Sequence, residues 1–477
     1  MKSTTLLLTL LALIFAIPKD LTILRIQETG QKTFQETNPD SFSAFLPLVR
    51  SNKGSQTPGP GSVLGVEASL SFGLNDMPEA DTAWVRLNGI KWSEVEPSRG
   101  ERNWGALSIH EAEWRSITAM GKNPILVVLS TPTWAQKVPG SYCGPIKSSE
   151  IQSFARFMHD LVARYSAPPY SIKHWELWNE PDVAGELISG DSPFGCWGDS
   201  RDPYYGGGYY AEMLKAVYPA VKSADPQAQV IIGGLLLDCD PRTASGCRED
   251  KTLPPKFLRG ILENGGEPYF DGVGFHAYDT YERLGQYSNP GWNSYWNTTG
   301  PAVIAKARYV KEILDQYGVS DKYLICTETA LMNRRSQCDE NCEMSKAFYV
   351  PQLFAATIAE GIKASIWYSL QMNWRHVALF DANGSPRHAY TAYAVAWDMF
   401  KNLAFSKELD AGSGVRGYEF IQGDHMLWVL WSIDNNAHPI SVPGELLAVT
   451  DVFGNPQPED NTRLAITIKP VYVQWRP

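Results

Sequence analysis

The chain has 477 residues, of which 44% are hydrophobic and 20% charged, so its composition is that of a folded globular protein rather than a disordered or collagen-like one. Its 42 basic and 52 acidic residues give a formal net charge of −10, and no segment is rich in lysine and arginine. This balance argues against nucleic acid or an anionic membrane as the main partner, because both attract positive charge. The 16 Trp and 22 Tyr favour flat apolar faces that hold an amphipathic partner.

The N-terminus has the pattern of an export signal. Met1-Lys2-Ser3 precedes an apolar stretch from Leu6 to Ile17 that only Thr9 interrupts. This stretch is too short to span a bilayer comfortably and fits the apolar region of a secretory signal. Because no clear cleavage site follows, residues 1–18 are interpreted as a signal peptide or an N-terminal anchor. We expect a secreted or cell-surface protein without a further membrane-spanning segment, and a flexible linker over residues 19–62.

The seven cysteines fit an oxidising compartment in which six of them pair. The short spacings predict the pairs Cys239 with Cys247 and Cys338 with Cys342, which leaves Cys143 to pair with Cys196. Cys326 lies within an apolar run and is predicted to be a buried free thiol. A zinc site is the alternative for Cys338 and Cys342, but no second cysteine pair at zinc spacing supports it. We expect no metal.

From Val63 to about Phe405, apolar runs of strand length alternate with longer periodic segments. The predicted strands are Val63–Leu70, Ala83–Leu87, Pro124–Ser130, Ile172–Trp178, Gln229–Leu235, Phe270–His276, Tyr323–Thr327 and Lys363–Ser369. The predicted helices include Glu150–Tyr165, Tyr209–Ser223, Pro301–Tyr317, Ser345–Glu360 and Ala389–Leu403. Eight apolar strands that alternate with helices predict an α/β protein with a (β/α)8 TIM barrel over residues 63–405.

The pattern changes in the last part of the chain. Short strand-like runs are Gly417–Ile421, Met426–Ser432, Leu447–Val452 and Leu464–Gln474, with turn-rich segments between them. Hairpins without helices predict a small β-sandwich domain over residues 406–477.

Two of the barrel strands end in a glutamate. The fourth strand runs into Trp178-Asn179-Glu180-Pro181, and the seventh into Cys326-Thr327-Glu328. Because chemistry in this architecture lies at the C-terminal ends of the strands, both carboxyl groups should reach the same mouth. Paired carboxyl groups on a rigid scaffold are what glycosidic bond cleavage requires.

These motifs resemble the clan A glycoside hydrolases, and within the clan family 39 and its relatives. The resemblance covers most of residues 63–405 and implies that Glu180 is the acid/base and Glu328 the nucleophile. It further implies substrate-binding or supporting roles for Asn179, at the sugar 2-hydroxyl, for Arg86, beside the nucleophile, and for His276, Tyr278 and Trp367.

One departure from the clan concerns the third strand, where Ser130-Thr131-Pro132-Thr133-Trp134 lacks the histidine that family 5 relatives often carry. This departure weakens a family 5 assignment. Trp134, an aromatic residue in the loop after the third strand, is a candidate for sugar binding, alongside ordinary loop packing. The same two interpretations apply to the other aromatic residues of the predicted mouth, which are Trp197, Tyr204, Tyr205, Trp292, Trp296 and Trp374.

The two glutamates need different protonation states. Arg86 and the Tyr278 hydroxyl should favour an ionised Glu328, whereas partial burial and the Glu328 anion should raise the pKa of Glu180. For a retaining enzyme the two carboxyl groups should be about 5 to 5.5 Å apart. Residues 176, 178 and 180 should share one face of the strand, so Glu176 is interpreted as a buried structural partner that points into the barrel, and His174 as a packed histidine.

The sequence therefore predicts an exported, retaining O-glycoside hydrolase that cleaves a polysaccharide or oligosaccharide by double displacement and needs no cofactor. The alternative is a catalytically silent cell-surface barrel that binds carbohydrate. A structural wall protein would explain the linker but not the acidic, aromatic mouth. The sequence leaves the sugar, the linkage, endo or exo action and the oligomeric state open.

Overall fold

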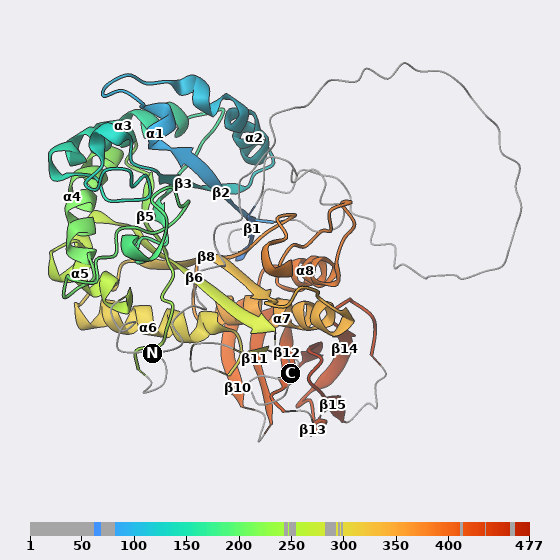
Figure 1. The fold of residues 1–477 in the computed structure, drawn as a ribbon. Coiled ribbons are helices and arrows are strands. Elements are labelled where there is room, and N and C mark those ends of the chain that lie inside the picture. Colours follow the sequence, from blue (N-terminus) through green and yellow to red (C-terminus); the bar gives the residue numbers. More distant parts are fainter. Residues whose placement is uncertain are drawn as a thin grey trace, which may run out of the picture. The chain divides into compact units, whose positions relative to one another are not determined.

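A computed structural model describes residues 62–67, 82–242, 247, 254–281, 292–293, 296, 299–410, 414–434, 436–457 and 463–477 (Figure 1). The predicted signal or anchor and nearly all of the predicted linker lie outside these residues. In the described part of the chain, no helix is both long and apolar enough to cross a membrane.

Eight parallel strands form a closed barrel. In chain order they are β1 (Leu64–Glu67), β2 (Trp84–Lys91), β3 (Asn123–Leu129), β4 (His174–Asn179), β5 (Gln229–Leu235), β6 (Gly272–Tyr281), β8 (Tyr323–Met332) and β9 (Ser365–Trp367). Each pairs in parallel with its neighbours, and the β5–β6 and β1–β9 pairings complete the ring. The short β7 (Trp292–Asn293) adds to β6 in antiparallel fashion. The predicted (β/α)8 architecture is confirmed.

The strands are apolar because the barrel interior covers one face and helices cover the other. All six residues of β4 are buried, as are all but the first residue of β3 and of β5. β6 and β8 continue past their predicted ends because they pair with each other as far as Thr280 and Met332. Tyr278, which lies after the predicted end of the sixth strand, is therefore part of β6.

Helices follow most of the strands and form the outer layer (Figure 1). They are α1 (Trp92–Val95), α2 (Ser108–Ala119), α3 (Ile151–Tyr165), α4 (Gly207–Ala224), α5 (Phe257–Glu263), α6 (Ala302–Gln316), α7 (Glu340–Ala359) and α8 (His388–Met399). Sequence periodicity did not indicate α1, α2 or α5, and the predicted start of α7 was five residues late. α7 starts early because the Asp339 carboxylate accepts a hydrogen bond from the Cys342 backbone N–H and so caps the helix.

Antiparallel strands form the C-terminal part, as predicted for a β-sandwich. One sheet has the order β10 (Ala404–Asp410), β11 (Val415–Gln422), β12 (His425–Ser432), β16 (Val471–Arg476) and β14 (Glu445–Asp451). β13 (His438–Ile440) pairs with β15 (Leu464–Ile466). The single strand predicted over Leu464–Gln474 is two strands, because Pro470 interrupts the run between β15 and β16.

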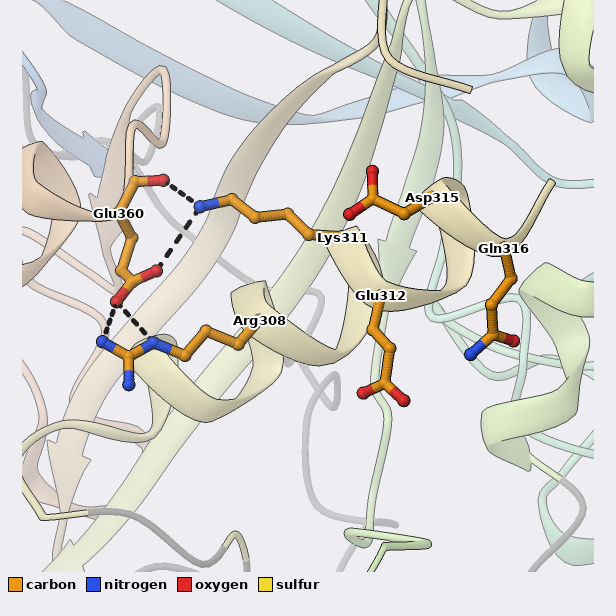
Figure 2. Close-up of a pocket in the computed structure, with 6 residues that line it drawn as sticks. All are labelled: Arg308, Lys311, Glu312, Asp315, Gln316 and Glu360. Carbon is orange, nitrogen blue, oxygen red and sulfur yellow. Dashed lines mark hydrogen bonds and ion pairs between the residues drawn. The ribbon is translucent and has the colours of Figure 1, made fainter. Parts of the chain in front are cut away.

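Charged side chains connect the helical layer to the C-terminal sheet. Arg308 and Lys311 on α6 both pair with Glu360 at the end of α7, and Arg308 also reaches Glu408 on β10. Figure 2 shows this group in a surface groove that Glu312, Asp315 and Gln316 also line. Both basic side chains of the groove are engaged with Glu360, so this part of the groove is explained by the packing of α6 against the end of α7.

The cysteine pairing agrees with the prediction. Disulfides join Cys143 to Cys196, Cys239 to Cys247 and Cys338 to Cys342. Cys326 is a free thiol and is buried in β8. The bridges constrain the segments that follow β3, β4, β5 and β8, which are the segments at the C-terminal end of the barrel.

Candidate active site

Arg86 lies at the centre of a buried polar cluster inside the barrel. Its Nη1 donates to Glu67 Oε2 at 2.8 Å and to Glu328 Oε1 at 2.6 Å. Its Nε donates to Glu176 Oε2 at 2.8 Å, and Nη2 donates to Asn179 Oδ1 at 2.8 Å. The side chain of Arg86 is fully buried, so the carboxylates around it supply all of its compensating charge.

The barrel closure brings these residues together from distant parts of the chain. Glu67 is the direct partner of Arg86 in the β1–β2 register, and His276 is the partner of Glu328 in the β6–β8 register. The β6–β8 register shifts between Phe275 and His276. Such an irregularity turns side chains toward a new direction, here the end of the barrel where the cluster lies.

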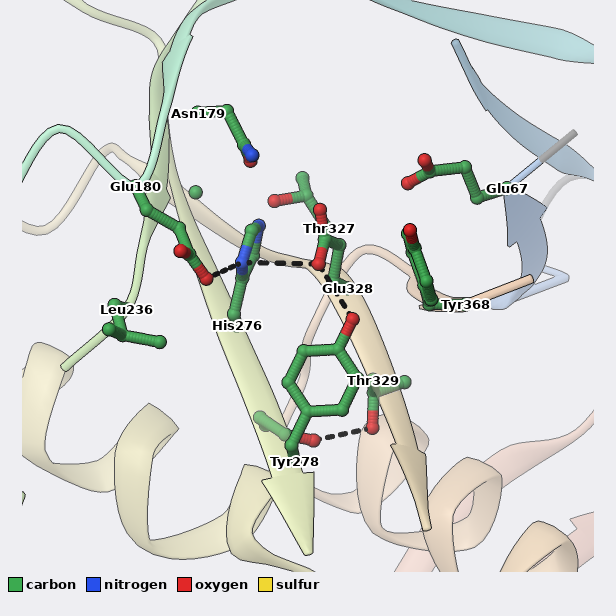
Figure 3. A network of polar contacts seen from close by, with 12 residues as sticks. Glu67, Asn179, Glu180, Leu236, His276, Tyr278, Thr327, Glu328, Thr329 and Tyr368 are labelled. Carbon is green, nitrogen blue, oxygen red and sulfur yellow. Dashed lines mark hydrogen bonds and ion pairs between the residues drawn. The ribbon is translucent and has the colours of Figure 1, made fainter. Parts of the chain in front are cut away.

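Glu328 is held as a hydrogen-bond acceptor. The Tyr278 hydroxyl donates to Glu328 Oε2 at 2.6 Å, and His276 Nδ1 lies 3.5 Å from the same oxygen (Figure 3). Burial raises the pKa of Tyr278 well above its usual value, so this hydroxyl keeps its proton and remains a donor. Arg86 and the Tyr278 hydroxyl therefore donate to different oxygens of the Glu328 carboxyl group.

Glu180 lies on the other side of His276. Its Oε1 is 2.9 Å from His276 Nδ1, and 14% of its side chain is exposed. Burial raises the pKa of Glu180 to about 7, although the charges of Lys306 and Arg86 oppose the increase. The sequence analysis also expected a contribution from the Glu328 anion, but burial is the main cause. Burial also lowers the pKa of His276 to about 4, so the ring is neutral at pH 7.

The two glutamates approach each other closely. One carboxylate oxygen of Glu180, one of Glu328 and a ring nitrogen of His276 all lie within 4.8 Å of one another. Such a triad can also hold a cation. Here, however, His276 Nδ1 already bonds to Glu180, and Tyr278 bonds to Glu328. The Glu180 carboxyl group, bonded to His276, thus lies beside the Glu328 carboxyl group, which accepts from Tyr278.

Glu176 is a buried structural partner, as expected. Besides Arg86, the Gly234 N–H donates to its Oε1 at 2.7 Å and the Thr327 hydroxyl at 3.0 Å. The prediction that residues 176, 178 and 180 share one face was wrong. The Trp178 indole packs outward against Phe154 on α3, and Trp178 and Glu180 have φ of 69° and 47°. This left-handed backbone breaks the alternation at the end of β4.

Behind Glu180, further buried groups hold the segment that follows β5. Asp182 accepts hydrogen bonds from the backbone N–H groups of Leu236 at 2.8 Å and Leu237 at 2.9 Å. Lys306 Nζ donates to the carbonyl oxygens of Leu236 and His276, both at 2.7 Å. The sequence analysis assigned no role to Asp182, Lys306 or Glu67. Glu67 had a usable signal, since it follows the apolar run Val63–Val66 just as Glu328 follows Tyr323–Thr327.

The aromatic candidates differ in exposure. Trp367 is fully buried, its indole N–H donates to the Val377 carbonyl, and no ring face is open. Trp134 is partly exposed, but its indole N–H donates to the Glu96 carbonyl and its ring packs on Trp92. Their sugar-binding roles remain predictions.

Of the other aromatic residues predicted at the mouth, Trp197, Tyr205, Trp292 and Trp296 are buried. Trp374 is partly exposed, and its ring centroid is 5.6 Å from that of Tyr278. Tyr204 is exposed as well, and Trp374 combines partial exposure with a ring contact to Tyr278 in the buried cluster.

Comparison with known proteins identifies the class of fold. No protein-family model matches the chain, and no curated protein sequence matches it. Solved structures do match. A family 39 glycoside hydrolase from Bacteroides cellulosilyticus WH2 has a TM-score of 0.66 at 20% identity, over 88% of this chain and 82% of that one.

A second match is a family 30 subfamily 8 xylanase from Clostridium acetobutylicum, with a TM-score of 0.56 at 12% identity over 88% of this chain and 97% of that one. A conserved exported protein from Bacteroides fragilis matches with a TM-score of 0.56 at 11% identity, over 82% of this chain and 88% of that one. The chain therefore has the fold of clan A glycoside hydrolases, and its likeness to family 39 agrees with the resemblance in its motifs.

Proposed function

We propose that the protein is a retaining O-glycoside hydrolase that acts on a polysaccharide or oligosaccharide, with Glu328 as nucleophile and Glu180 as acid/base. The observation that carries this proposal is the approach of the two carboxylates, since one oxygen of Glu180 lies within 4.8 Å of one oxygen of Glu328. Retaining enzymes separate their carboxyl groups by about 5 to 5.5 Å, whereas inverting enzymes leave about 6.5 to 9.5 Å for a water molecule.

In the first half of the reaction, Glu328 attacks the anomeric carbon while Glu180 gives its proton to the leaving oxygen. A pKa of about 7 leaves Glu180 protonated in much of the enzyme at neutral pH. Arg86 and Tyr278 donate to different oxygens of Glu328 and hold its carboxyl group in one orientation.

In the second half, Glu180 has lost its proton and acts as base toward water, which attacks the anomeric carbon and frees Glu328. Neutral His276 stays bonded to Glu180 and fixes the direction of its carboxyl group. The amide of Asn179 is held by Arg86 and is proposed to contact the sugar 2-hydroxyl.

The proposal also covers the class of substrate and the cellular location. Some structural neighbours are xylanases, and one with a TM-score of 0.54 at 10% identity is a bifunctional glucanase-xylanase. Because the sequence identities are low, the activities of these neighbours only indicate that xylan and glucan are the first polysaccharides to test. The disulfides and the N-terminal apolar stretch support an exported protein.

The test is a panel of aryl glycosides and polysaccharides with the intact protein, Glu328→Gln and Glu180→Ala. Glu328→Gln should abolish turnover, whereas Glu180→Ala should retain activity on activated aryl glycosides and recover with azide, because azide needs no general base. The exposed carboxylate of Glu212, on α4, supplies the control Glu212→Gln, which should behave like the intact protein.

Proton NMR of the first product should show the configuration of the substrate. Inversion of configuration, or equal turnover in the three proteins, would contradict the mechanism. Binding of polysaccharide without turnover would instead favour the silent carbohydrate-binding barrel.

A further inference from the structure

Glu67 is a third carboxylate beside the proposed nucleophile, and the reaction described above does not use it. Its Oε2 and Glu328 Oε1 accept hydrogen bonds from the same atom, Arg86 Nη1, at 2.8 Å and 2.6 Å. Glu176 holds the other side of the guanidinium. Three carboxylates with side chains at most 9% exposed thus face one positive charge. A buried cluster with two uncompensated negative charges is costly, so one of the carboxyls should hold a proton.

The hydrogen bonds indicate which carboxyl holds it. Glu176 accepts from Arg86, the Gly234 N–H and the Thr327 hydroxyl. Glu328 accepts from Arg86 and Tyr278. Among the described residues, the Glu67 side chain accepts from Arg86 alone. Since hydrogen-bond donors stabilise the charged form, Glu67 is the least stabilised anion of the three.

We propose that Glu67 holds a proton while Glu328 is ionised and releases it when Glu328 is bonded to the sugar, so that Arg86 faces two anionic carboxylates in both halves of the reaction. This inference rests on the proposed function. Glu67 acts through Arg86 and is therefore a positioning residue. Its titration keeps the charge around Arg86 constant while the charge of the nucleophile disappears and returns.

The proton balance is closed over one cycle. Glu328 uses a carboxylate lone pair to bond to the anomeric carbon and so loses its negative charge, while the aglycone leaves with the electron pair of the broken bond. Glu67 then releases its proton to solvent. When water breaks that bond, Glu328 becomes a carboxylate again and Glu67 takes a proton from solvent. No oxidant, reductant or further reactant takes part.

The surroundings of Glu67 support this titration. Burial raises the pKa of Glu67 to about 8, Arg86 opposes the increase, and the charges of Glu328 and Glu176 add to it. Tyr278 and Tyr368 also lie close, and Figure 3 shows the Tyr368 ring next to Glu67. Removing the Glu328 charge therefore lowers the pKa of Glu67. The coupling is reciprocal: an ionised Glu67 favours the step in which Glu328 loses its charge.

The test uses Glu180→Ala, so that titration of the proposed acid does not obscure that of Glu67. The substrate is a 2,4-dinitrophenyl glycoside, whose leaving group needs no proton. The value of kcat/KM, which reports the first half of the reaction, should rise about fivefold between about pH 6 and about pH 9, the size expected for one partly screened charge beside another. In Glu180→Ala/Glu67→Gln it should stay level, and in Glu180→Ala/Glu212→Gln it should rise again.

The outcomes separate this inference from the proposed function. If Glu180→Ala and its double variants with Glu67→Gln and with Glu212→Gln all hydrolyse the glycoside with the same pH profile, the role of Glu67 is overturned and the glycosidase assignment stays intact. If neither the wild type nor Glu180→Ala cleaves the glycoside, the proposed function fails and takes this inference with it.

A second measurement does not depend on the folding of the Glu67 variant. Trapping Glu180→Ala with a 2,4-dinitrophenyl 2-deoxy-2-fluoroglycoside forms the sugar ester and releases a dinitrophenolate anion without a proton. In weakly buffered indicator solution near pH 7, Glu67 should then release a substantial fraction of one proton per trapped site. Stoichiometric trapping without proton release would refute the proposal.

Discussion

Replacing Arg86 by methionine should destabilise the protein strongly, and the loss should depend on pH. Arg86 is fully buried and donates hydrogen bonds to three carboxylates and one amide. Methionine has a similar length but no charge, so the carboxylates would remain buried without a cation. Breaking a buried ion pair in this way typically costs about 3 to 5 kcal/mol. We expect a loss of about 4 kcal/mol in the free energy of unfolding at neutral pH.

The sign of the pH dependence follows from Glu67. Its pKa is already raised by burial, and Arg86 is the main influence that lowers it, so removing Arg86 raises it further. A raised pKa in the folded state stabilises the fold at pH values below about 4.5, where the unfolded chain also binds the proton. That contribution is lost as the pH rises toward the folded value, by about 1.4 kcal/mol per unit for one carboxyl. Glu67 of the wild type is ionised above about pH 8, whereas in Arg86→Met it would keep its proton there, so the cost of Arg86→Met should increase above about pH 8.

Urea denaturation followed by tryptophan fluorescence at about pH 7 and about pH 9.5 measures both effects. The exposed Arg115 on α2 supplies a matched control, and Arg115→Met should unfold like the wild type at both pH values. Arg86→Lys should lie between, since lysine restores the charge but not the planar fork. A loss below about 1 kcal/mol, or one that is equal at both pH values, would refute the charge argument.

Three more predictions follow from the site and its surroundings. Hydrolysis of substrates with poor leaving groups should decline above about pH 7, where Glu180 loses its proton, and a pH profile of kcat/KM that stays level to about pH 9 would contradict its role as acid. Gly234→Ala should lower kcat about 100-fold, because the added methyl group would lie 2.1 Å from His276 Nε2 and displace the ring; unchanged kcat in a protein with wild-type circular dichroism would contradict this. Replacing both Cys143 and Cys196 by serine should lower the free energy of unfolding by about 4 kcal/mol, since their bridge closes a loop of 53 residues; a urea midpoint unchanged from that of the oxidised wild type would count against it.

Local patterns in the chain were sufficient for the architecture and for part of the site. Apolar runs of strand length predicted all eight barrel strands because both faces of a barrel strand are covered. Short spacings predicted the cysteine pairs because neighbouring residues need no tertiary contact to meet. Asn179-Glu180 and Glu328 were recognisable because each directly follows an apolar strand, a position that the barrel turns into the mouth.

Other features depend on contacts between residues that are far apart in the sequence. The three carboxylates around Arg86 are separated from it by 19, 90 and 242 residues, and only barrel closure shows that they share one guanidinium. The same holds for the raised pKa of Glu180, whose main cause is burial by the surrounding segments. The outward turn of Trp178 needs a left-handed backbone that strand alternation does not predict.

Sequence patterns and tertiary structure therefore determine different properties of the protein, for a physical reason. Periodicity and turn residues report whether a segment is a strand or a helix and which face it buries, since these depend on neighbouring residues. The charge of a carboxyl depends instead on every group within a few ångströms and on the water that remains there. For Glu67, whose place in the sequence resembles that of Glu328, only the packed barrel decides that it shares a donor with the nucleophile and competes with it for one positive charge.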